Sequence, residues 1–349
     1  MHYGIPVNNL LVQNYDLTLA HYGEKLIGDD ILFKQIILTP KKIGPFIYFK
    51  ENIYKLCQKF DAVIVLSDLH ILPYITLGLF SKRKFALTYY GIGVSASYNK
   101  KFDIDKRSDL IRFNLMKRAD SNVFYSEYPI QRYVDAGIKR DSLFVAHNTI
   151  QITDKIEISH NKESFLFVGT LYKEKKIYDL LNAYYITYKK DKNLKSLIII
   201  GNGTEKSNIE KWISESGIAH KIFLKGAIYD STLLKSFYSD AIACISPGQA
   251  GLSVLSCFAY GVPFITTFDA ITGGELFNIK NGVNGYLYSG EVSELADILI
   301  LLNNDKEKVY ELSKNAQEYY FNNRTLDMMV KGLSDAVNYA LFNVCHDTK

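Results

Sequence analysis

Apolar segments with the features of buried β-strands alternate with helix-like segments along almost the whole chain. In the first half, the strand-like segments are short, rich in branched and aromatic residues, and bounded by turn residues; they cover residues 16–23, 33–40, 61–68, 84–91, 121–127 and 142–148. Helix-like periodicity lies between several of them, at residues 45–60, 72–82, 106–119 and 128–136. This alternation is typical of parallel strands joined by crossover helices, so it predicts an α/β fold.

A polar stretch without a core pattern, residues 151–163, separates this half from a second run of the same alternation. The length of 349 residues suits two domains. We expect residues 1–150 to form a first Rossmann-like domain and residues 164–305 a second, doubly wound domain, joined by the polar linker. In the second domain, strands are expected at 164–170, 196–203, 221–227, 241–248 and 263–269, and helices at 176–190, 205–216, 231–239, 253–260 and 291–303. The tail, residues 306–349, predicts two more helices.

Composition and charge exclude several other classes of protein. The formal net charge of +4 is too small an excess to indicate a nucleic-acid-binding protein. Cys57, Cys244 and Cys257 lie in apolar patterns and no pair has Cys-x-x-Cys spacing, so we expect buried free thiols in a reducing compartment. The chain lacks a signal-peptide pattern and any run of about 18 apolar residues, which predicts a cytoplasmic protein. No metal-ligand cluster stands out, and no metal or other cofactor is expected.

Glycines stand at the ends of successive predicted strands in the second half. They are Gly169, Gly201, Gly203, Gly226, Gly248 and Gly251. In an open parallel sheet, ligands bind beyond the carboxyl ends of the strands, where glycine lets the backbone approach a phosphate. Any one of these glycines could merely end a strand, but their succession favours a nucleotide site. The P-loop pattern is absent, and IIIGNG lacks the third glycine of a dinucleotide fingerprint.

Lysines follow the first of these glycines in the turn GTLYKEKK, residues 169–176. A lysine in a strand-to-helix turn is a flexible point charge suited to a diphosphate. A solvated basic turn is the simpler interpretation for Lys173. Lys175 is the better candidate for a diphosphate ligand.

These motifs together resemble a known family. FVGTLYKEKK, IIIGNG, FLKGAIYD, CISPGQAGLSVLSCFAYGVPFIT and NGVNGYLY occur in the order and spacing of the C-terminal domain of family-4 GT-B glycosyltransferases. KRADSNVFYSEYPIQRYVDAGIKRDSLFVAHNTI is similar to the end of their N-terminal domain. The resemblance, from about Asp61 to Asp305, implies a GT-B fold of two Rossmann-like domains facing each other across a cleft. It also implies that a last helix near 325–345 crosses back to the first domain.

The resemblance further implies a nucleotide-sugar donor in the second domain, with UDP- or GDP-sugars expected. The transfer would be retaining and metal-free, with Lys175 and helix N-termini stabilising the diphosphate leaving group. The implied donor-binding residues are Gly169, Thr170, Lys175, Gly201, Gly203, Gly226, Gly251, Leu252, Ser253 and Ser256.

The chain departs from the family pattern at functional positions. Gly248 and Ser256 occupy the two places of the usual Glu-x7-Glu pair, so both carboxylates are missing. Thr170 replaces the usual arginine, and Tyr90 replaces a histidine in the first domain. The pattern looks like a variant branch used in bacterial surface-polysaccharide assembly, in which Glu275 of Gly-Gly-Glu supplies a carboxylate. The alternative interpretation of Glu275 is a solvated loop acid or a charge at a helix N-terminus.

Acceptor-side candidates lie in the first half. His70 follows a predicted strand, and Gly91 and Gly93 belong to the small, flexible segment GIGVSAS. A structural role is the stronger interpretation for His70 and also for His147. The chain opens on HYGIPVNNLL, which resembles the helix after the first strand of such a domain; either the start is misassigned or the sheet lacks one strand.

We therefore predict transfer of a sugar from a nucleotide diphosphate to a glycan, expected to be lipid-linked, in O-antigen (lipopolysaccharide) or capsule biosynthesis. The alternatives are a non-catalytic nucleotide-sugar-binding relative and a GT-B sugar-nucleotide epimerase. Residues 41–60 predict a helix with Lys50, Lys55 and Lys59 at the edges of an apolar surface, suited to peripheral contact with the inner face of the cytoplasmic membrane. Its alternative is an ordinary helix that buries one face against the sheet.

Overall fold

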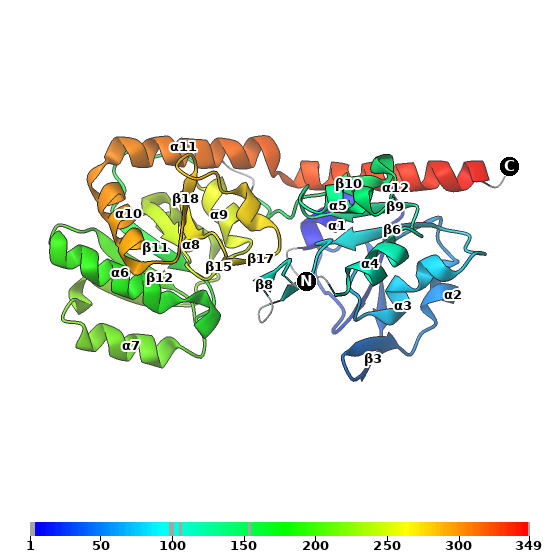
Figure 1. Cartoon of the computed structure of the whole chain (residues 1–349), viewed down its shortest axis with the longest axis horizontal. Coiled ribbons are helices and arrows are strands. Elements are labelled where there is room, and N and C mark those ends of the chain that lie inside the picture. Colours follow the sequence, from blue (N-terminus) through cyan, green and yellow to red (C-terminus); the bar gives the residue numbers. More distant parts are fainter. Residues whose placement is uncertain (1–3, 98–100, 105–106, 153–154, 348–349) are drawn as a thin grey trace. The chain divides into compact units, whose positions relative to one another are not determined.

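The computed structural model describes residues 4–97, 101–104, 107–152 and 155–347. The chain divides into two compact units, each built around its own parallel β-sheet (Figure 1). Unit 1 consists of Met1–Ser95, Asp103–Gln151 and Thr325–Lys349, and unit 2 consists of Ala96–Phe102 and Ile152–Arg324. The tail therefore contributes one helix to each unit, α11 (Lys306–Asn323) to unit 2 and α12 (Leu326–Asp347) to unit 1.

In unit 1, the main sheet has the strand order β10-β9-β6-β5, and a second parallel pair joins β1 to β2. The strands are β1 (Thr18–Tyr22), β2 (Lys34–Leu38), β5 (Ala62–Leu66), β6 (Ala86–Gly91), β9 (Ser121–Phe124) and β10 (Leu143–Val145). The helices are α1 (Ile5–Leu11), α2 (Ile53–Cys57), α3 (Leu72–Ile75), α4 (Asp109–Met116) and α5 (Ile130–Asp135). Helix α12 packs on α1 and on this sheet. A Cβ on its Gly332 would lie 2.2 Å from the Val145 carbonyl oxygen, so glycine permits the close approach.

Unit 2 has the more regular sheet, with the order β13-β12-β11-β14-β16-β18 and every pairing parallel. The strands are β11 (Ser164–Val168), β12 (Ser196–Ile200), β13 (Ile222–Gly226), β14 (Ala241–Ile245), β16 (Phe264–Thr267) and β18 (Gly285–Tyr288). The helices are α6 (Ile177–Lys190), α7 (Lys206–Glu215), α8 (Ser231–Asp240), α9 (Ser253–Ala259), α10 (Val292–Asn304) and α11. Strands β11, β12 and β14 are almost wholly buried because helices cover both faces.

The prediction of a helix at residues 45–60 is wrong. Residues 40–49 form a β-hairpin of β3 (Pro40–Ile43) and β4 (Phe46–Phe49), and only α2 is helical in the remainder. Gly44 has φ +58, a left-handed conformation that suits a tight two-residue loop, and Pro45 is the second residue of that loop, where no N–H is needed for the strand pairing. The apolar residues whose spacing fits a helical stripe thus belong in part to the strands of a hairpin.

Two other expectations can be compared with the described residues. Cys57, Cys244 and Cys257 are buried and free, as the sequence predicts. In the described part of the chain, no helix is both long and apolar enough to cross a membrane.

Candidate functional site

The strand-end glycines of unit 2 form one tightly packed set of loops. Gly169 N–H donates to the Ile200 carbonyl at 3.0 Å, and Gly201 N–H donates to the Gly226 carbonyl at 2.8 Å. A Cβ on Gly201 would lie 1.9 Å from the Gly169 carbonyl oxygen, and one on Gly203 would lie 2.2 Å from that of Leu171. Close packing of backbone on backbone therefore requires glycine at residues 201 and 203. A glycine that merely ends a strand would not be under this constraint.

Lys175 lies beside these loops, at the end of a short 3₁₀ turn (Lys173–Lys175) before α6. Its side chain is buried, and Nζ would be 3.4 Å from a Cβ on Gly169. Among the residues that the structure describes, Nζ has no hydrogen-bond acceptor or carboxylate partner. It lies over the Tyr172 ring, 5.9 Å from the ring centre. Burial lowers the pKa of Lys175 to about 8. The site thus holds a desolvated cation without an anion.

Gly248, at the first place of the missing glutamate pair, packs directly on this turn. Its N–H donates to the Lys175 carbonyl at 3.1 Å, and a Cβ would lie 1.9 Å from the Glu174 carbonyl oxygen. A carboxylate side chain has no room here unless the backbone moves. At the second place, Ser256 on α9 is half-buried, with Oγ donating to the Leu252 carbonyl at 3.4 Å.

Glu275 is joined to the same region through a short parallel ribbon, β15 (Gln249–Ala250) with β17 (Ile271–Thr272). Ile271 N–H donates to the Gly248 carbonyl at 3.0 Å. Glu275 follows this ribbon at the start of a 3₁₀ turn and is 5% exposed. Its Oε2 accepts hydrogen bonds from Gly273 N–H at 3.0 Å and from the Thr272 hydroxyl at 3.5 Å. It is a buried, oriented carboxylate and not a solvated loop acid.

The remaining donor candidates lie at the carboxyl ends of β11 and β13 or at the start of α9. Gly226 ends β13 with φ +73, and Gly251 and Leu252 lead into α9, which begins at Ser253. A Cβ on Gly226 or Gly251 would meet nothing within 4 Å, so packing does not require glycine at either position. Thr170 follows Gly169 and is exposed.

The acceptor-side candidates belong to unit 1. Tyr90, near the end of β6, donates its hydroxyl to Asn148 Oδ1 at 3.4 Å and meets the Tyr125 ring edge-on at 4.8 Å. Gly91 packs on Ser67, whose Oγ would lie 2.2 Å from a Cβ. Gly93 has φ +80, and a Cβ there would lie 2.7 Å from the Phe124 ring. Gly93 is thus required by its conformation and its packing, whereas the neighbour of Gly91 is a hydroxyl that can rotate.

The two histidines have local partners. His70 is largely exposed, and its Nδ1 lies 2.8 Å from Asp68 Oδ1. His147 Nδ1 lies 3.0 Å from the Tyr125 carbonyl, and Nε2 lies 3.1 Å from Glu127 Oε1. These contacts fit the structural interpretation favoured for both residues.

Sequence reasoning missed a buried ionic cluster in unit 1. The Arg132 guanidinium bridges Asp103 and Asp109, and Arg112 Nη1 donates to Asp109 Oδ1 at 2.8 Å. The Tyr128 hydroxyl donates to Asp103 Oδ2 at 2.7 Å, and this hydrogen bond raises the tyrosine pKa. These residues are too widely spaced in sequence to produce a motif. The cluster fixes the backbone where the chain leaves the GIGVSAS segment, since Asp103 N–H donates to the Ser95 carbonyl at 2.7 Å.

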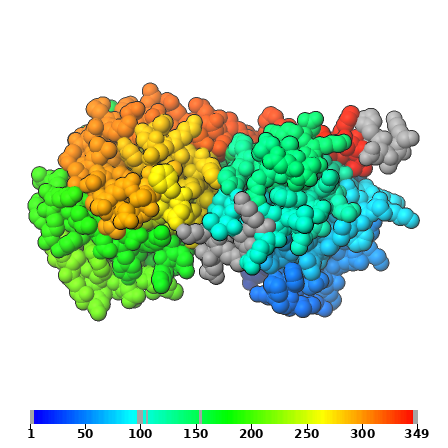
Figure 2. Space-filling view, in the orientation of Figure 1, coloured from blue at the N-terminus to red at the C-terminus, as the bar shows by residue number. Residues whose placement is uncertain are grey.

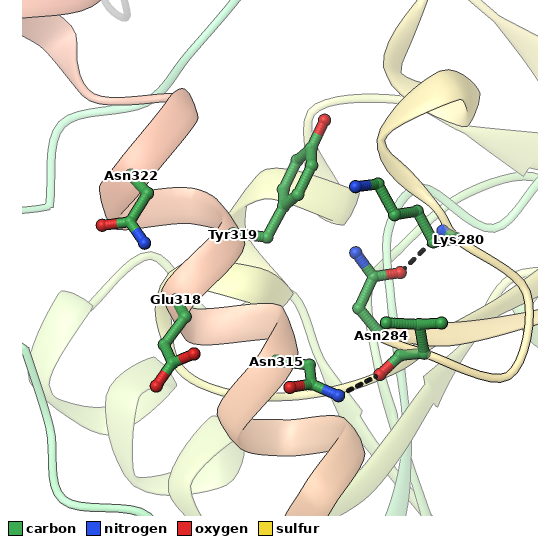
Figure 3. Close-up of a pocket in the computed structure, with 7 residues that line it drawn as sticks. Lys280, Asn284, Asn315, Glu318, Tyr319 and Asn322 are labelled. Carbon is green, nitrogen blue, oxygen red and sulfur yellow. Dashed lines mark hydrogen bonds between the residues drawn. The ribbon is translucent and has the colours of Figure 1, made fainter.

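Two shallow hollows lie on unit 2, away from the glycine loops. The first, of about 200 Å³, is lined by Lys280, Val283, Asn284, Asn315, Glu318, Tyr319 and Asn322 (Figure 3). Here Lys280 Nζ and the Arg324 guanidinium lie 5.5 and 5.1 Å from the centre of the Tyr319 ring, and Arg324 Nη2 donates to the Tyr319 hydroxyl at 2.8 Å. The second, of about 410 Å³, lies where residues 155–158 meet α11. Neither contains a buried cation or a strand end, so we place the candidate site at the glycine loops.

Within the described ranges, no three His, Cys, Asp or Glu side chains are placed to hold a metal ion. The glycine loops offer the binding of an anion by Lys175 and by backbone N–H groups, and the ribbon of β15 with β17 joins them to the loop of one oriented carboxylate.

Comparison with known proteins matches residues 148–319 to the family model described as glycosyl transferases group 1. The chain is 26% identical over 178 residues to the alpha-monoglucosyldiacylglycerol synthase of Acholeplasma laidlawii, covering 50% of this chain and 44% of that protein. It is 22% identical over 249 residues to the poly(glycerol-phosphate) alpha-glucosyltransferase of Bacillus subtilis (strain 168), covering 68% and 36%. The chain thus spans less than half the length of either relative.

Among solved structures, the chain is similar to Anabaena HepE in complex with UDP and glucose, with a TM-score of 0.67 and 15% identity. The similarity covers 96% of this chain and 94% of that one. The chain therefore has the α/β GT-B fold with parallel sheets, and that prediction from the sequence is confirmed.

The contact at Gly248 generates a first prediction. Gly248→Glu restores the residue that the family pattern expects, but its Cβ would meet the Glu174 carbonyl. We expect a loss of about 1–3 kcal/mol in the free energy of unfolding, as for overpacking. Urea unfolding of Gly248→Glu beside Gly251→Glu, where a Cβ meets nothing within 4 Å, tests this. Equal stability of the two variants contradicts it.

Lys175 generates a second prediction. The folded pKa of about 8 lies below the ordinary 10.5, so between these values the unfolded chain holds a proton that the folded chain has released. The free energy of unfolding should therefore rise with pH across this window. At pH 7, Lys175→Met should stabilise the protein by up to about 3 kcal/mol, since it removes the buried charge.

The measurement is urea unfolding of the wild type and Lys175→Met from pH 7 to pH 10. The advantage of the variant should shrink as the pH rises. Lys173→Met, which replaces an exposed lysine of the same turn, is the control and should change neither stability nor its pH dependence. A destabilised Lys175→Met at pH 7 contradicts the prediction.

Proposed function

We propose that the chain is a glycosyltransferase that moves a sugar from a nucleotide diphosphate donor to a glycan acceptor. The single observation that carries the proposal is the buried, unpartnered Lys175 among the glycine loops of unit 2. A desolvated cation costs stability unless an anion joins it, and a diphosphate supplies that anion. The loops lie within residues 148–319, which match the glycosyl transferases group 1 model. UDP in the HepE complex favours a UDP-sugar, with a GDP-sugar as the other donor to test.

The reaction then needs little beyond charge stabilisation. The bond between the anomeric carbon and the β-phosphate oxygen breaks, and the acceptor hydroxyl forms the new glycosidic bond. Lys175 stabilises the negative charge that develops on the leaving diphosphate. The hydroxyl proton passes to that diphosphate, and the outcome is retention of configuration. No bound metal is required in this scheme.

Glu275 is proposed to contact the donor sugar or ribose in place of the two missing glutamates. The ribbon of β15 with β17 brings its loop to Gly248, whose contact with Glu174 leaves no room for a carboxylate. On the acceptor side, we propose that Tyr90 takes the place of the family histidine, and that His70, Gly91 and Gly93 lie along the acceptor site.

The acceptor is proposed to be a lipid-linked glycan of a cell-surface polysaccharide, reached from the cytoplasmic side of the membrane. The names of the two relatives, a monoglucosyldiacylglycerol synthase and a poly(glycerol-phosphate) glucosyltransferase, support a lipid or surface-polymer acceptor. The lack of a carboxylate at Gly248 favours a second candidate, a relative that binds nucleotide sugars without catalysis.

The deciding experiment is a thermal-shift panel with UDP, GDP, TDP and CMP. A ligand that binds only the folded state raises the melting temperature. We expect UDP or GDP to raise it in the wild type and in Lys173→Met but not in Lys175→Met. No shift with any nucleotide overturns a donor site at the glycine loops.

Activity separates the enzyme from its alternatives. With the donor so identified, Glu275→Gln should lower transfer or donor hydrolysis about 100-fold or more, with little change in melting temperature. Glu210→Gln, on the exposed face of α7, is the control. Binding without turnover in the wild type indicates the non-catalytic relative, and interconversion of epimers without acceptor indicates an epimerase. A Glu275→Gln variant whose melting temperature falls while the activity per folded molecule is unchanged would make the residue structural.

A further inference from the structure

The segment of residues 40–60 carries an unusual share of the charge of the chain; it contains the hairpin of β3 and β4, with Lys41 and Lys42, and helix α2. Five of the 41 basic residues but only one of the 37 acidic residues lie between residues 40 and 60, leaving 36 of each sign elsewhere. The formal charge of +4 on the whole chain therefore equals the charge of this one segment. All five lysines, Lys41, Lys42, Lys50, Lys55 and Lys59, are exposed.

None of these lysines has an acidic partner among the residues that the structure describes. The one acid of the segment, Glu51, is used at the base of the hairpin, where its carboxylate accepts hydrogen bonds from Thr39 N–H at 2.9 Å and from the Thr39 hydroxyl at 3.0 Å. Hydrogen bonding to the Thr39 backbone lowers the pKa of Glu51. The positive charge of the hairpin is thus left for an external partner.

The tip of the hairpin is apolar and open to solvent. Ile43 pairs with Phe46 across the two-residue loop Gly44–Pro45, and these side chains are 64% and 38% exposed. Paired residues share a face, so both project to the same side. The hairpin forms part of the lower edge of unit 1 in the views of Figure 1 and Figure 2, where its residues are blue.

The base of the hairpin, by contrast, is held rigidly. Phe49 is buried and stacks on Tyr74 with ring centres 5.4 Å apart. Ile47 N–H donates to the His70 carbonyl at 2.7 Å, and Lys50 N–H donates to the Thr39 carbonyl at 2.9 Å. A rigid base presents Ile43 and Phe46 in a fixed position, so little conformational freedom is lost when they leave water.

We propose that this hairpin is a membrane-contact surface, whose Ile43 and Phe46 enter the interfacial layer of an anionic bilayer while Lys41 and Lys42 bind lipid phosphates. Lys42 and Lys41 stand one and two residues back from Ile43, on opposite faces of β3, so an apolar tip with a lysine on each face matches the two layers of a membrane surface. A nucleic acid would leave the apolar tip in water, and residues 40–60 contain no arginine to contact bases. The inference deepens the proposed function, since it identifies the surface that would meet a lipid-linked acceptor.

Flotation of the full chain with vesicles tests the proposal, using phosphatidylcholine alone and phosphatidylcholine with phosphatidylglycerol. We expect binding only to the anionic vesicles, weakening as salt is added. Lys41→Gln with Lys42→Gln should weaken it about 30-fold at low salt, from about fivefold for each lysine. Ile43→Ser with Phe46→Ser should weaken it about tenfold or more.

Lys189→Gln with Lys192→Gln is the matched control, because it removes the same charge from two exposed lysines of unit 2. It should bind like the wild type. Absence of wild-type binding overturns the proposal, as does equal loss in this control. Wild-type binding by Ile43→Ser with Phe46→Ser overturns insertion of the tip, and equally tight binding to a short DNA duplex points to nucleic acid instead.

The nucleotide thermal shift, measured on the same preparations, keeps this test separate from the proposed function. It also shows that each variant is folded. A chain that responds to UDP or GDP but does not float overturns the membrane surface alone. A chain that floats but responds to no nucleotide supports the membrane surface and overturns the donor site.

Discussion

The contact between Gly248 and the Glu174 carbonyl is the constraint around which the candidate site is built. Because no side chain fits at residue 248, the backbone of Gly248 packs directly on the backbone of the turn that ends at Lys175. Lys175 itself is buried, and this burial lowers its pKa to about 8. The packing at Gly248 excludes a carboxylate that could neutralise the cation from this side. The position without its glutamate and the buried lysine thus lie in backbone contact with each other.

The alternation of strand-like and helix-like segments was enough to predict the α/β class, because buried strands and amphipathic helices have different periods. It failed at residues 45–60, where apolar residues fit either period. There, Gly44 and Pro45 form the loop of the hairpin. Gly44 immediately precedes the segment that the helical pattern covers, and Pro45 is its first residue. A local turn signal should therefore take precedence over a hydrophobic stripe that begins within one residue of it.

The candidate site shows a similar division. The glycines and Lys175 could be found from sequence because each follows a strand, where the topology fixes its place. Asp103, Asp109 and Arg132 could not, since their contacts depend on the return of the chain through α4 and α5. The burial of Glu275 was also invisible in the sequence, because it follows from the pairing of β17 with β15.

Charge is therefore used in two opposite ways within the chain. In unit 2, one lysine is desolvated, so its interaction with an anion is strong and little affected by salt. On the hairpin of unit 1, Lys41 and Lys42 are exposed, so each contributes weakly, and only the two together with the adjacent apolar tip make a useful surface. The first arrangement suits a ligand that must be held at one point during a reaction. The second suits a broad anionic surface to which binding must remain reversible.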